Sequence, residues 1–451
     1  MKSFLTITIL FLTTPTYAGQ GMGPGPGLNS YANYVTDNFN RANGGLGANW
    51  TTVPGWAAPQ IISNTVGASA DGTESDAYWS GSYTWTAAQY SQIQMPTLPN
   101  STSGDCGAGT NLQSSPNETG YYCSYFKDGG TTLHLHWGKN VNAVNLDIST
   151  PFTTITAGDT IQALYDGYNL KCFVNGTLEY SRPDETIVST YGNGAGSFGG
   201  ANGACRMDNY QGGNATAYSK GSDPALVSAS KAWNTDFTGT THTSFTVTAG
   251  AAVTAGNTPV MTIAWFGQSA APTSVTDSLG QTWVQAPGSF NYNSGATAAI
   301  AVYYFPGTLS GTPTVTASWG ASSASYIGMT FAEFSGIMDN NPSVPVDVTT
   351  ASQINWTSST TNNAKNTSIS TSANKELVYS GLYIYSNNGT ISAAGTGFTL
   401  INKNTTGSMT NAFGDEYQLQ TAFGSVTGQF TATWTSGTVS AMTTAVAFFK
   451  H

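Results

Sequence analysis

Two histidines stand two residues apart in the segment L-H-L-H-W at residues 133–137. Because successive side chains of a strand point to opposite faces, His134 and His136 would share one face, about 7 Å apart. Imidazoles at that spacing could chelate a metal ion or frame an anionic sugar. Asn145 and Asp147 lie on the polar face of a nearby predicted strand and could join them. A pair of solvent-facing histidines explains the pattern more simply, and we favour that explanation.

The sequence carries no pattern for a serine triad, which needs a nucleophile, a base and an orienting acid. It contains four histidines and no G-x-S-x-G elbow. Glu333 is in phase with Ile327, Met329 and Phe331 on a face predicted to be buried, where an unpaired carboxylate is costly. We interpret Glu333 as a structural group bonded to backbone or tyrosine hydroxyls, and Asp277 as the cap of a hairpin turn.

Aromatic residues make up 12% of the chain, including 11 tryptophans and 23 tyrosines. Aromatic faces can stack on sugar rings, and neutral amides can satisfy sugar hydroxyls. A surface rich in asparagine and tryptophan and nearly free of charge therefore suits neutral glycans. β-Sandwich cores also contain aromatic residues, so only part of this set is available for binding. From their loop or strand-edge context, the candidates are Trp56, Trp79, Trp85 and Trp137.

The positions of these side chains depend on a fold that the composition indicates. Only 8% of residues are charged, against about 25% in an average soluble domain. Strong helix formers are scarce, and residues that fit pleated sheets are abundant. The net charge is −10, and no Lys or Arg occurs between Lys231 and Lys365. Such a surface argues against binding nucleic acid or inserting into anionic membranes.

The first 18 residues have the pattern of a signal peptide: a basic Lys2, an apolar run at 4–12 and small residues before Gly19. Residues 19–33 form a Gly/Pro-rich leader that cannot pack. We therefore expect a secreted, extracellular or cell-surface protein with its signal removed.

Four cysteines follow, and in an exported chain they predict two disulfides. No pair has the C-x-x-C spacing of a zinc site, so we assign no metal. Three pairings are open: we favour Cys106–Cys123 and Cys172–Cys205, because neighbours in sequence are easiest to close. A loop of the first size would stabilise the fold by roughly 3 kcal/mol.

Short segments that alternate apolar and polar residues, separated by turn signals, predict strands along most of the chain. All four cysteines precede Gln211, and Gly-rich punctuation follows. We therefore place a linker at 218–228, between a first sandwich at 34–217 and a second at 229–451. The predicted fold class is all-β, with two antiparallel β-sandwich (jelly-roll) domains in tandem.

The first block resembles the concanavalin A-like, laminin-G-like modules of bacterial and phage exoproteins. The matching segments are D-N-F-N-R-A-N at 37–43, G-L-G-A-N-W at 45–50, the hairpin at 170–178, the glycine loop at 192–200 and M-D-N-Y at 207–210. The resemblance implies two stacked antiparallel sheets, one concave and often used to hold glycans. We interpret the first of these segments as scaffold: Asp37 and Arg41 join a strand end to a loop, and Trp50 plugs the sheet edge.

Some relatives in that resemblance are glycosidases, and the laminarinase-like ones carry E-x-D-x-x-E on one strand. The string here begins with Glu74 and Asp76 but ends on Trp79 in place of the last glutamate. The family's catalysis is therefore not carried over, and we expect Glu74 and Asp76 to be solvated. Concanavalin-like folds often hold calcium at a rim, but no dense Asp/Asn loop is present. We expect no cofactor and leave calcium open.

The second block resembles a β-sandwich domain of secreted bacterial proteins, immunoglobulin-like or jelly-roll, with no implied activity. The matching words are T-D-S-L-G-Q-T-W at 276–283, F-A-E-F-S-G at 331–336, K-E-L-V at 375–378 and A-V-A-F-F at 445–449. Pro259–Phe266 is apolar on both faces and is predicted to be a central strand. Residues 244–266 and 368–384 show a weak echo but no clear repeat.

The sequence therefore predicts a secreted, non-catalytic, carbohydrate-binding or adhesive protein, whose partner is a glycan or cell-surface polysaccharide. The first domain would hold the ligand, and the second would act as a stalk or partner module. One alternative is a phage or cell-surface appendage protein with a structural or receptor-binding role. Another is a polysaccharide-degrading glycoside hydrolase.

Overall fold

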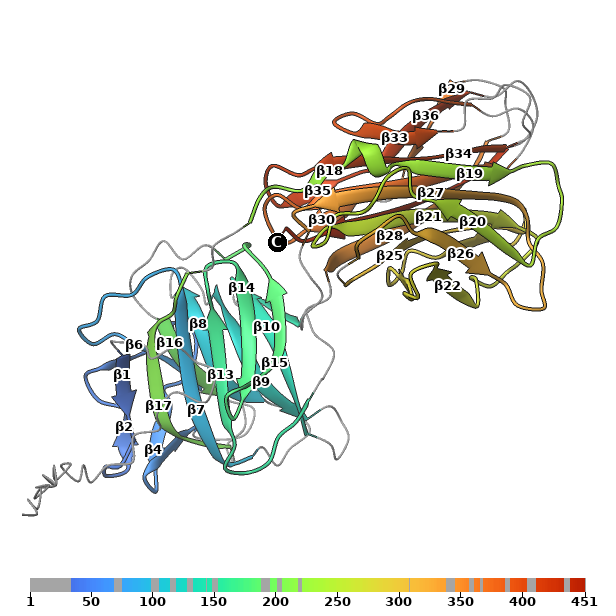
Figure 1. Ribbon diagram of the computed structural model, residues 1–451. Coiled ribbons are helices and arrows are strands. Elements are labelled where there is room, and N and C mark those ends of the chain that lie inside the picture. The colour runs from blue at the N-terminus through green and yellow to red at the C-terminus, as the bar shows by residue number, and fades with distance from the viewer. Residues whose placement is uncertain are drawn as a thin grey trace, which may run out of the picture.

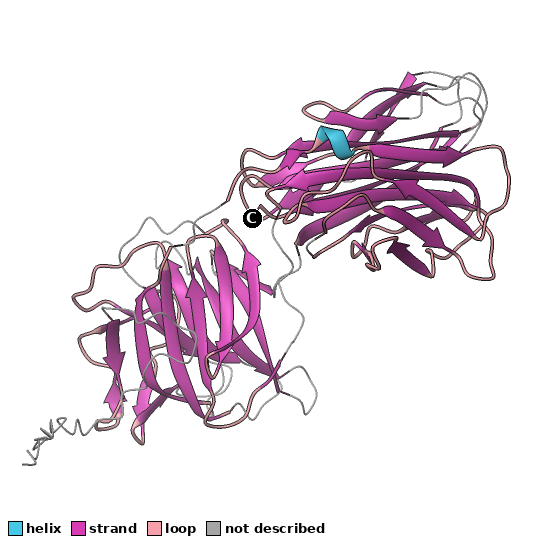
Figure 2. Ribbon diagram, viewed as in Figure 1, coloured by secondary structure: helices cyan, strands magenta, loops and turns pink. Residues whose placement is uncertain are grey.

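The computed structural model describes residues 34–450, apart from 69–74, 99–104, 114–118, 128–132, 143, 148–152, 188–194, 201–204, 218–220, 308, 338–344, 357–360, 366–367, 386–389, 404–410 and 434–438. Within this part of the chain the regular structure is strand, with one short 3-10 turn, η1 (Ser228–Ser230) (Figure 2). The all-β prediction is confirmed. None of the described helices is long and apolar enough to cross a membrane.

Residues 34–214 form two antiparallel sheets, which we call the first lobe (Figure 1). The larger sheet contains, in order, β15 (Thr177–Pro183), β14 (Asn169–Val174), β13 (Thr160–Tyr165), β7 (Gln89–Thr97), β17 (Arg206–Asn214), β5 (Thr65–Gly67), β4 (Gln60–Ile62) and β2 (Gly44–Gly45), with β1 (Tyr34–Asp37) beside β17. The smaller sheet contains, in order, β11 (Val144–Asp147), β10 (Leu133–Val141), β9 (Thr119–Lys127), β8 (Asp105–Gln113), β16 (Ala195–Gly200), β6 (Ser75–Trp79) and β3 (Trp50–Thr52), with β12 (Thr153–Thr154) beside β10.

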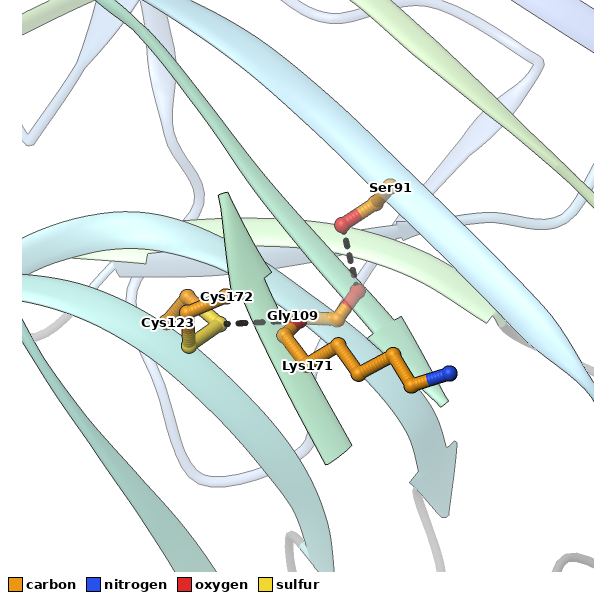
Figure 3. Close-up of a disulfide and its surroundings, with 5 residues drawn as sticks. All are labelled: Ser91, Gly109, Cys123, Lys171 and Cys172. Atoms are coloured by element: carbon orange, nitrogen blue, oxygen red, sulfur yellow. Dashed lines mark hydrogen bonds between the residues drawn. A yellow bond between two sulfur atoms is a disulfide. The ribbon is translucent and has the colours of Figure 1, made fainter. Parts of the chain in front are cut away.

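Both disulfides join one sheet of the first lobe to the other. Cys106 of β8 bonds to Cys205, the residue before β17, and Cys123 of β9 bonds to Cys172 of β14 (Figure 3). The predicted pairing of sequence neighbours was therefore wrong. Cys106 and Cys123 belong to adjacent strands of the same sheet, where their cross-strand partners are Tyr125 and Ala108. All four cysteines are buried between the sheets, so each reaches a sulfur on the opposite layer.

Residues 225–450 form the second lobe, which contains two β-sandwiches. The first has a seven-stranded sheet of β18 (Ala225–Leu226), β27 (Ser325–Ser335), β21 (Thr258–Phe266), β25 (Ala298–Tyr304) and β23 (Val284–Gln285), with β19 (Ala232–Asp236) and β24 (Asn291–Asn293) at its margins, and a three-stranded sheet of β20 (Ser244–Thr248), β26 (Thr314–Ser318) and β22 (Ser274–Asp277). The second has a five-stranded sheet of β28 (Val346–Trp356), β37 (Val439–Phe448), β31 (Leu377–Tyr385), β34 (Asn411–Leu419) and β33 (Thr399–Lys403), a three-stranded sheet of β29 (Thr361–Lys365), β36 (Gln429–Thr433) and β32 (Thr390–Ala393), and the pair β30 (Ile369–Thr371) and β35 (Gly424–Val426).

These two sandwiches have the same strand order, and we call them the first repeat (232–335) and the second repeat (346–448). The large sheet reads β19-β27-β21-β25-β23 in the first repeat and β28-β37-β31-β34-β33 in the second. The small sheet reads β20-β26-β22 and β29-β36-β32. The sequence predicts a single sandwich here, whereas the structure shows a duplicated one.

The large sheets of the two repeats pack on each other, so the second lobe has four layers. Along β21, Met261, Ile263 and Trp265 face the small sheet of their own repeat, while Val260 and Ala264 face the second repeat. A strand covered on both faces and paired at both edges is expected to be mostly apolar. The prediction of a central strand over these residues is confirmed.

A buried polar cluster joins the two repeats at the centre of the lobe. The Tyr379 hydroxyl donates to Asp415 Oδ2 at 2.6 Å and lies 3.0 Å from Thr262 Oγ1 and 3.2 Å from Thr330 Oγ1. Burial raises the pKa of Asp415 to about 6. Gly381 keeps the layers close, because a Cβ there would lie 2.7 Å from Thr262 Cγ2.

The lobes meet at a joint centred on Arg182 of β15. Its guanidinium forms an ion pair with the buried Asp347 of the second lobe. It also lies 5.7 Å from the ring centroids of Trp137, in the first lobe, and Phe449, in the second. A planar cation between two aromatic rings, paired with a buried carboxylate, fixes one lobe against the other.

Three hydrogen bonds that involve backbone groups also connect the two lobes. The Tyr168 hydroxyl donates to the Lys450 carbonyl at 2.9 Å, and the Asn374 amide donates to Glu185 Oε2 at 2.8 Å. The Glu185 amide donates to the Ser372 carbonyl at 2.9 Å. The lobes are therefore joined by direct contacts as well as by the chain between them.

Candidate functional site

The turn that follows β6 in the first lobe forms a pocket of about 320 Å³. The pocket is lined by aromatic and small polar residues, none of them charged: Tyr78, Trp79, Ser80, Gly81, Ser82, Tyr83 and Trp85. Two of the predicted binding residues, Trp79 and Trp85, are therefore brought together. Each is only 7% exposed, so little of either ring is accessible.

The start of this turn is held by the strand next to β6. The Asn49 carbonyl accepts hydrogen bonds from the backbone amides of Ser80, at 2.9 Å, and Gly81, at 3.1 Å. The Thr51 hydroxyl donates to the Ser80 hydroxyl at 2.7 Å. These contacts follow from the pairing of β3 with β6, in which Trp50 lies opposite Trp79.

The end of the turn is held by Asn214, at the end of β17. Its Oδ1 accepts from the Thr86 amide at 2.8 Å, and its Nδ2 donates to the Thr84 carbonyl at 2.9 Å. The Asn214 amide donates to the Tyr83 hydroxyl at 3.1 Å. Because both ends are fixed, the pocket is preformed, and a ligand would pay little ordering entropy on binding.

An aromatic stack supports the Trp79 wall of the pocket. The Trp50 ring meets Trp79 edge-on at 5.3 Å and Tyr210 edge-on at 4.7 Å. The Trp50 indole donates to Asp37 Oδ2 at 2.8 Å, and Arg41 holds the same carboxylate through two hydrogen bonds of 2.6 and 2.9 Å. The interpretation of this segment as scaffold is confirmed: Asp37, Arg41 and Trp50 position the wall from behind.

The Trp85 wall depends on a close approach of backbone. The rings of Tyr83 and Trp85 lie 4.4 Å apart. Behind them, a Cβ at Gly212 would lie 2.1 Å from the Tyr210 hydroxyl oxygen and 3.4 Å from Trp85 Cη2. Only glycine therefore fits at 212. Burial raises the pKa of the Tyr210 hydroxyl well above its usual value, so that group stays neutral.

Two polar atoms approach the face of Gly81. The Trp79 Nε1 donor is buried and has no hydrogen-bond partner among the described residues. A Cβ built on Gly81 would lie 3.0 Å from this nitrogen and 2.9 Å from Asn49 Oδ1. Glycine at 81 therefore lets the Trp79 ring and the Asn49 side chain pack closely against the backbone of the turn.

The other predicted tryptophans lie elsewhere in the first lobe. Trp56 is half-buried against Val53, Tyr78 and Leu112, and it is not among the pocket-lining residues. Its indole nitrogen also lacks a partner among the described residues. Trp137 is fully buried in the core beneath Arg182, so it offers no accessible face to a sugar.

The predicted polar residues on β10 and β11 cannot be placed in a site. The side chains of His134, His136, Asn145 and Asp147 lie outside the described part of the structure. Their backbones belong to paired strands, with Asp147 opposite Gly138 and Asn145 opposite Asn140.

The carboxylates considered for catalysis have structural surroundings. Asp76 is buried in β6, so the expectation that it is solvated was wrong, and Glu74 lies outside the described residues. Glu333 is fully buried and accepts from the Ser230 hydroxyl, from the Thr254 amide at 2.9 Å and from Asn257. Its predicted structural role is confirmed.

Asp277 also has the predicted role of a turn cap. It accepts from the amides of Leu279, at 2.9 Å, and Gln281, at 3.1 Å, and from the Trp283 indole at 3.0 Å. Among the residues that the structure describes, no three His, Cys, Asp or Glu side chains come together as they would around a metal ion.

Sequence reasoning missed the other five lining residues, Tyr78, Ser80, Gly81, Ser82 and Tyr83, as well as Asn49, which holds the turn. A signal was available in the string W-S-G-S-Y-T-W at 79–85, which places three aromatic residues in a Ser/Gly-rich turn. Asn49 had no local signal, because only strand pairing brings it to Gly81.

No protein-family model and no curated protein matches the chain. Similar solved structures include the carbohydrate binding module CBM66 from Bacillus subtilis, at 16% identity, with 37% of this chain and 94% of that chain covered and a TM-score of 0.25. The carbohydrate recognition domain of Emp47p has 14% identity, covers 41% and 95%, and has a TM-score of 0.30. The GH16 endo-beta-1,3(4)-glucanase SCLam has 11% identity, covers 43% and 96%, and has a TM-score of 0.29. These TM-scores are too low to indicate what this chain binds.

Proposed function

We propose that this is a secreted protein that binds carbohydrate without catalysis, through the pocket that follows β6. The observation that carries the proposal is the pocket's composition: aromatic walls, small hydroxyl-bearing residues at the rim and no charged side chain. Binding sites for small ligands are typically concave and largely apolar, with a few polar groups that fix orientation. Neutral sugars match that mixture, because each ring combines apolar C–H faces with hydroxyl groups.

Export is part of the same proposal. Disulfides persist in oxidising compartments, and the first lobe has two of them, each joining the two sheets. The signal-like pattern of the first 18 residues supports the same localisation.

The absence of catalysis is proposed from the carboxylates. Retaining or inverting hydrolysis needs two carboxyl groups on either side of the scissile bond. Among the described residues no carboxylate lines the pocket, and Asp76, an acid in the strand before it, is 3% exposed. The pocket therefore has groups to hold a sugar but none to protonate a leaving group.

The test is a glycan array with the full chain, oxidised, in the presence of calcium and again with EDTA. We expect selective binding to a few neutral glycans, with no release of reducing ends from the same panel. A flat array would overturn the proposed function. Release of reducing ends would move the chain to the hydrolases. A signal that disappears with EDTA would show that calcium takes part.

A further inference from the structure

We propose that Asp347 and Glu376 share one proton where the two lobes meet, and that the joint loosens when this proton is lost at alkaline pH. Asp347 lies in β28 and Glu376 directly before β31, both in the second lobe. Asp347 is also the partner of Arg182 from the first lobe. The joint would therefore respond to pH whatever ligand the pocket binds.

Glu376 lacks the counter-charge that two buried carboxylates of the first lobe have. Asp184 forms an ion pair with Lys139 at 2.6 Å, and Asp166 forms one with Lys171 at 2.7 Å. Glu376 is fully buried and forms no ion pair with the described residues. An ionised carboxylate without a partner is costly to bury, so such a group retains its proton to higher pH.

One loop holds the two acids of the joint side by side. The Ser372 amide donates to Asp347 Oδ2 at 2.7 Å, and the Ala373 amide donates to Glu376 Oε1 at 2.6 Å. The other oxygen of Glu376, Oε2, is buried and receives no hydrogen bond from the described residues. The side chains of Glu376 and Asp347 nevertheless lie within hydrogen-bonding reach of each other. Ionised carboxylates only accept, so this contact is a hydrogen bond only if one of the two acids carries a proton.

Arg182 brings one positive charge to this pair of acids. It forms its ion pair with Asp347, whose side chain is 1% exposed. Arg182 Nε and Glu376 Oε2 are both buried and have no hydrogen-bond partner among the described residues, so the guanidinium does not bind the second acid. Two ionised carboxylates beside one guanidinium would leave a buried negative charge unbalanced, and a proton on Glu376 removes that charge.

The other ionisable groups around the joint have partners of their own. These are Asp223 with Lys375 and Lys450, Asp184 with Lys139, Glu185 with the Asn374 amide, Tyr168 with the Lys450 carbonyl, and Tyr180 with Arg182. Burial raises the pKa of Tyr180, so its hydroxyl stays neutral. The lysines near the joint are therefore engaged by other carboxylates and do not neutralise Glu376.

The pKa of Glu376 gives the direction of the effect. Burial, reinforced by the charge of Asp347, raises this pKa well above its usual value. The first lobe contributes to the burial, because Tyr168 packs on Ala373, whose amide binds Glu376. Separating the lobes would let water reach the two acids and lower the pKa of Glu376. The closed joint therefore binds the proton more tightly, and this contribution to closure is lost as pH rises through the raised pKa.

The experiment measures the radius of gyration of the full chain by small-angle X-ray scattering, from about pH 5 to about pH 10. We expect the radius of the wild-type protein to increase at the alkaline end. Glu376→Gln keeps a donor for Asp347 but cannot ionise, so its radius should stay at the acidic value throughout. Glu416→Gln is the matched control, because it removes a buried acid outside the joint and should leave the response unchanged. Circular dichroism at each pH verifies that the lobes remain folded.

Infrared spectroscopy reports the proton itself. A protonated carboxyl group has a carbonyl band that a carboxylate lacks. The spectrum of the wild-type protein minus that of Glu376→Gln should contain this band at neutral pH. The band should disappear over the pH range in which the radius increases.

Each outcome decides the proposal. A wild-type radius that is constant or falls as pH rises would overturn it, and so would an increase that Glu376→Gln shares. Absence of the carboxyl band at neutral pH would show that Asp347 and Glu376 do not share a proton. If Glu376→Gln does not fold, Glu416→Gln still provides the test. Asp415, with a pKa of about 6, is then mostly ionised at pH 8, so a carboxyl band must remain there for Glu376.

Discussion

Both lobes consist of stacked β-sheets, but the sheets are held together differently in each lobe. The first lobe links its sheets with two disulfides that span 99 and 49 residues. The second has no cysteine and stacks a duplicated sandwich into four layers with a shared core. The first lobe has a pocket at a turn, whereas in the second lobe the large sheets of the two repeats pack against each other. Covalent links in the first lobe and a shared apolar core in the second therefore serve the same purpose, which is to hold sheets together.

The second lobe contains a further comparison, between its two repeats. Counted from the first residue of each strand, Val302 and Tyr303 of β25 correspond to Asp415 and Glu416 of β34. Burial raises the pKa of Glu416 to about 8 and that of Asp415 to about 6. The same strand order therefore tolerates apolar and acidic residues at matching positions. Alternation and turns determine the pairing, and residue identity can diverge until the repeat is no longer visible in the sequence.

The largest expected effect comes from removing the longer disulfide. Cys106→Ser with Cys205→Ser should lower the free energy of unfolding of the first lobe by about 4–5 kcal/mol, because the unfolded chain regains the entropy of an open loop. Segment-resolved hydrogen exchange in urea measures the two lobes separately. We expect protection to fall in residues 34–214 and to remain in 225–450. An equal loss in both lobes would contradict the division of stability between them.

The next effect concerns the shared core of the repeats. Phe413 packs with Ala264 and Ile300 of the first repeat, and a Cβ on Gly328 would lie 2.6 Å from its ring. Phe413→Ala should destabilise the second lobe by about 3–5 kcal/mol, because a cavity forms between the layers. Phe423→Ala, at a side chain that is 40% exposed, is the control and should cost less than about 1 kcal/mol. Similar costs for both would mean that the repeats do not stabilise each other.

The third effect is pH dependence confined to the second lobe. Glu416 has a folded-state pKa of about 8, raised by burial, against about 4.3 in an unfolded chain. The folded state therefore holds the proton more tightly, and stability is full below pH 4 and is lost as pH rises towards 8. Thermal unfolding between pH 5 and 8 measures the slope. Glu416→Gln should reduce the slope and leave the part that comes from Asp415, whose pKa of about 6 lies in the same range. A slope that Glu416→Gln leaves unchanged would assign the whole titration to other groups.

The smallest effect concerns the joint between the lobes. Arg182→Ala removes the ion pair to Asp347 and the cation between Trp137 and Phe449. We expect a cost of about 2 kcal/mol, because a charge-assisted hydrogen bond to a buried carboxylate is lost. Small-angle scattering should show a wider range of lobe separations. Arg182→Lys keeps the charge but loses the stacking on the aromatic rings. Its range of lobe separations should fall between those of the wild-type protein and Arg182→Ala. An unchanged scattering curve for Arg182→Ala would mean that other contacts hold the lobes.

Local patterns predicted most of the fold. A double-faced apolar run indicated the central strand β21, because the side-chain period is a property of the segment itself. The caps at Asp277 and Asp37 were also predictable, since their partners are near in sequence. These features need no knowledge of which strand lies beside which.

The rest depended on the order of the strands, which no single segment encodes. The cysteine pairing was wrong because β8 and β9 lie side by side in one sheet, and each of their cysteines bonds to a cysteine of the opposite sheet. The pocket was predicted only in part. Asn49 reaches Gly81 through the pairing of β3 with β6, and no local pattern in the sequence indicates that pairing. Tryptophan type alone did not indicate that Trp137 is a core residue while Trp79 lines a cavity.

The strand order of the two repeats has a consequence for how the polypeptide reaches its native state. In each repeat the strand made last, β27 or β37, lies inside the large sheet, between the first strand and β21 or β31. Until this last strand is in place, the first strand has no partner strand in the large sheet, and its backbone amides remain hydrogen-bonded to water. Folding must therefore wait for contacts between residues about a hundred positions apart in the sequence, which makes it slow. Until those contacts form, apolar surface and unpaired strand edges stay exposed to solvent. Chains that lack the final strand of a repeat should accordingly be prone to aggregation.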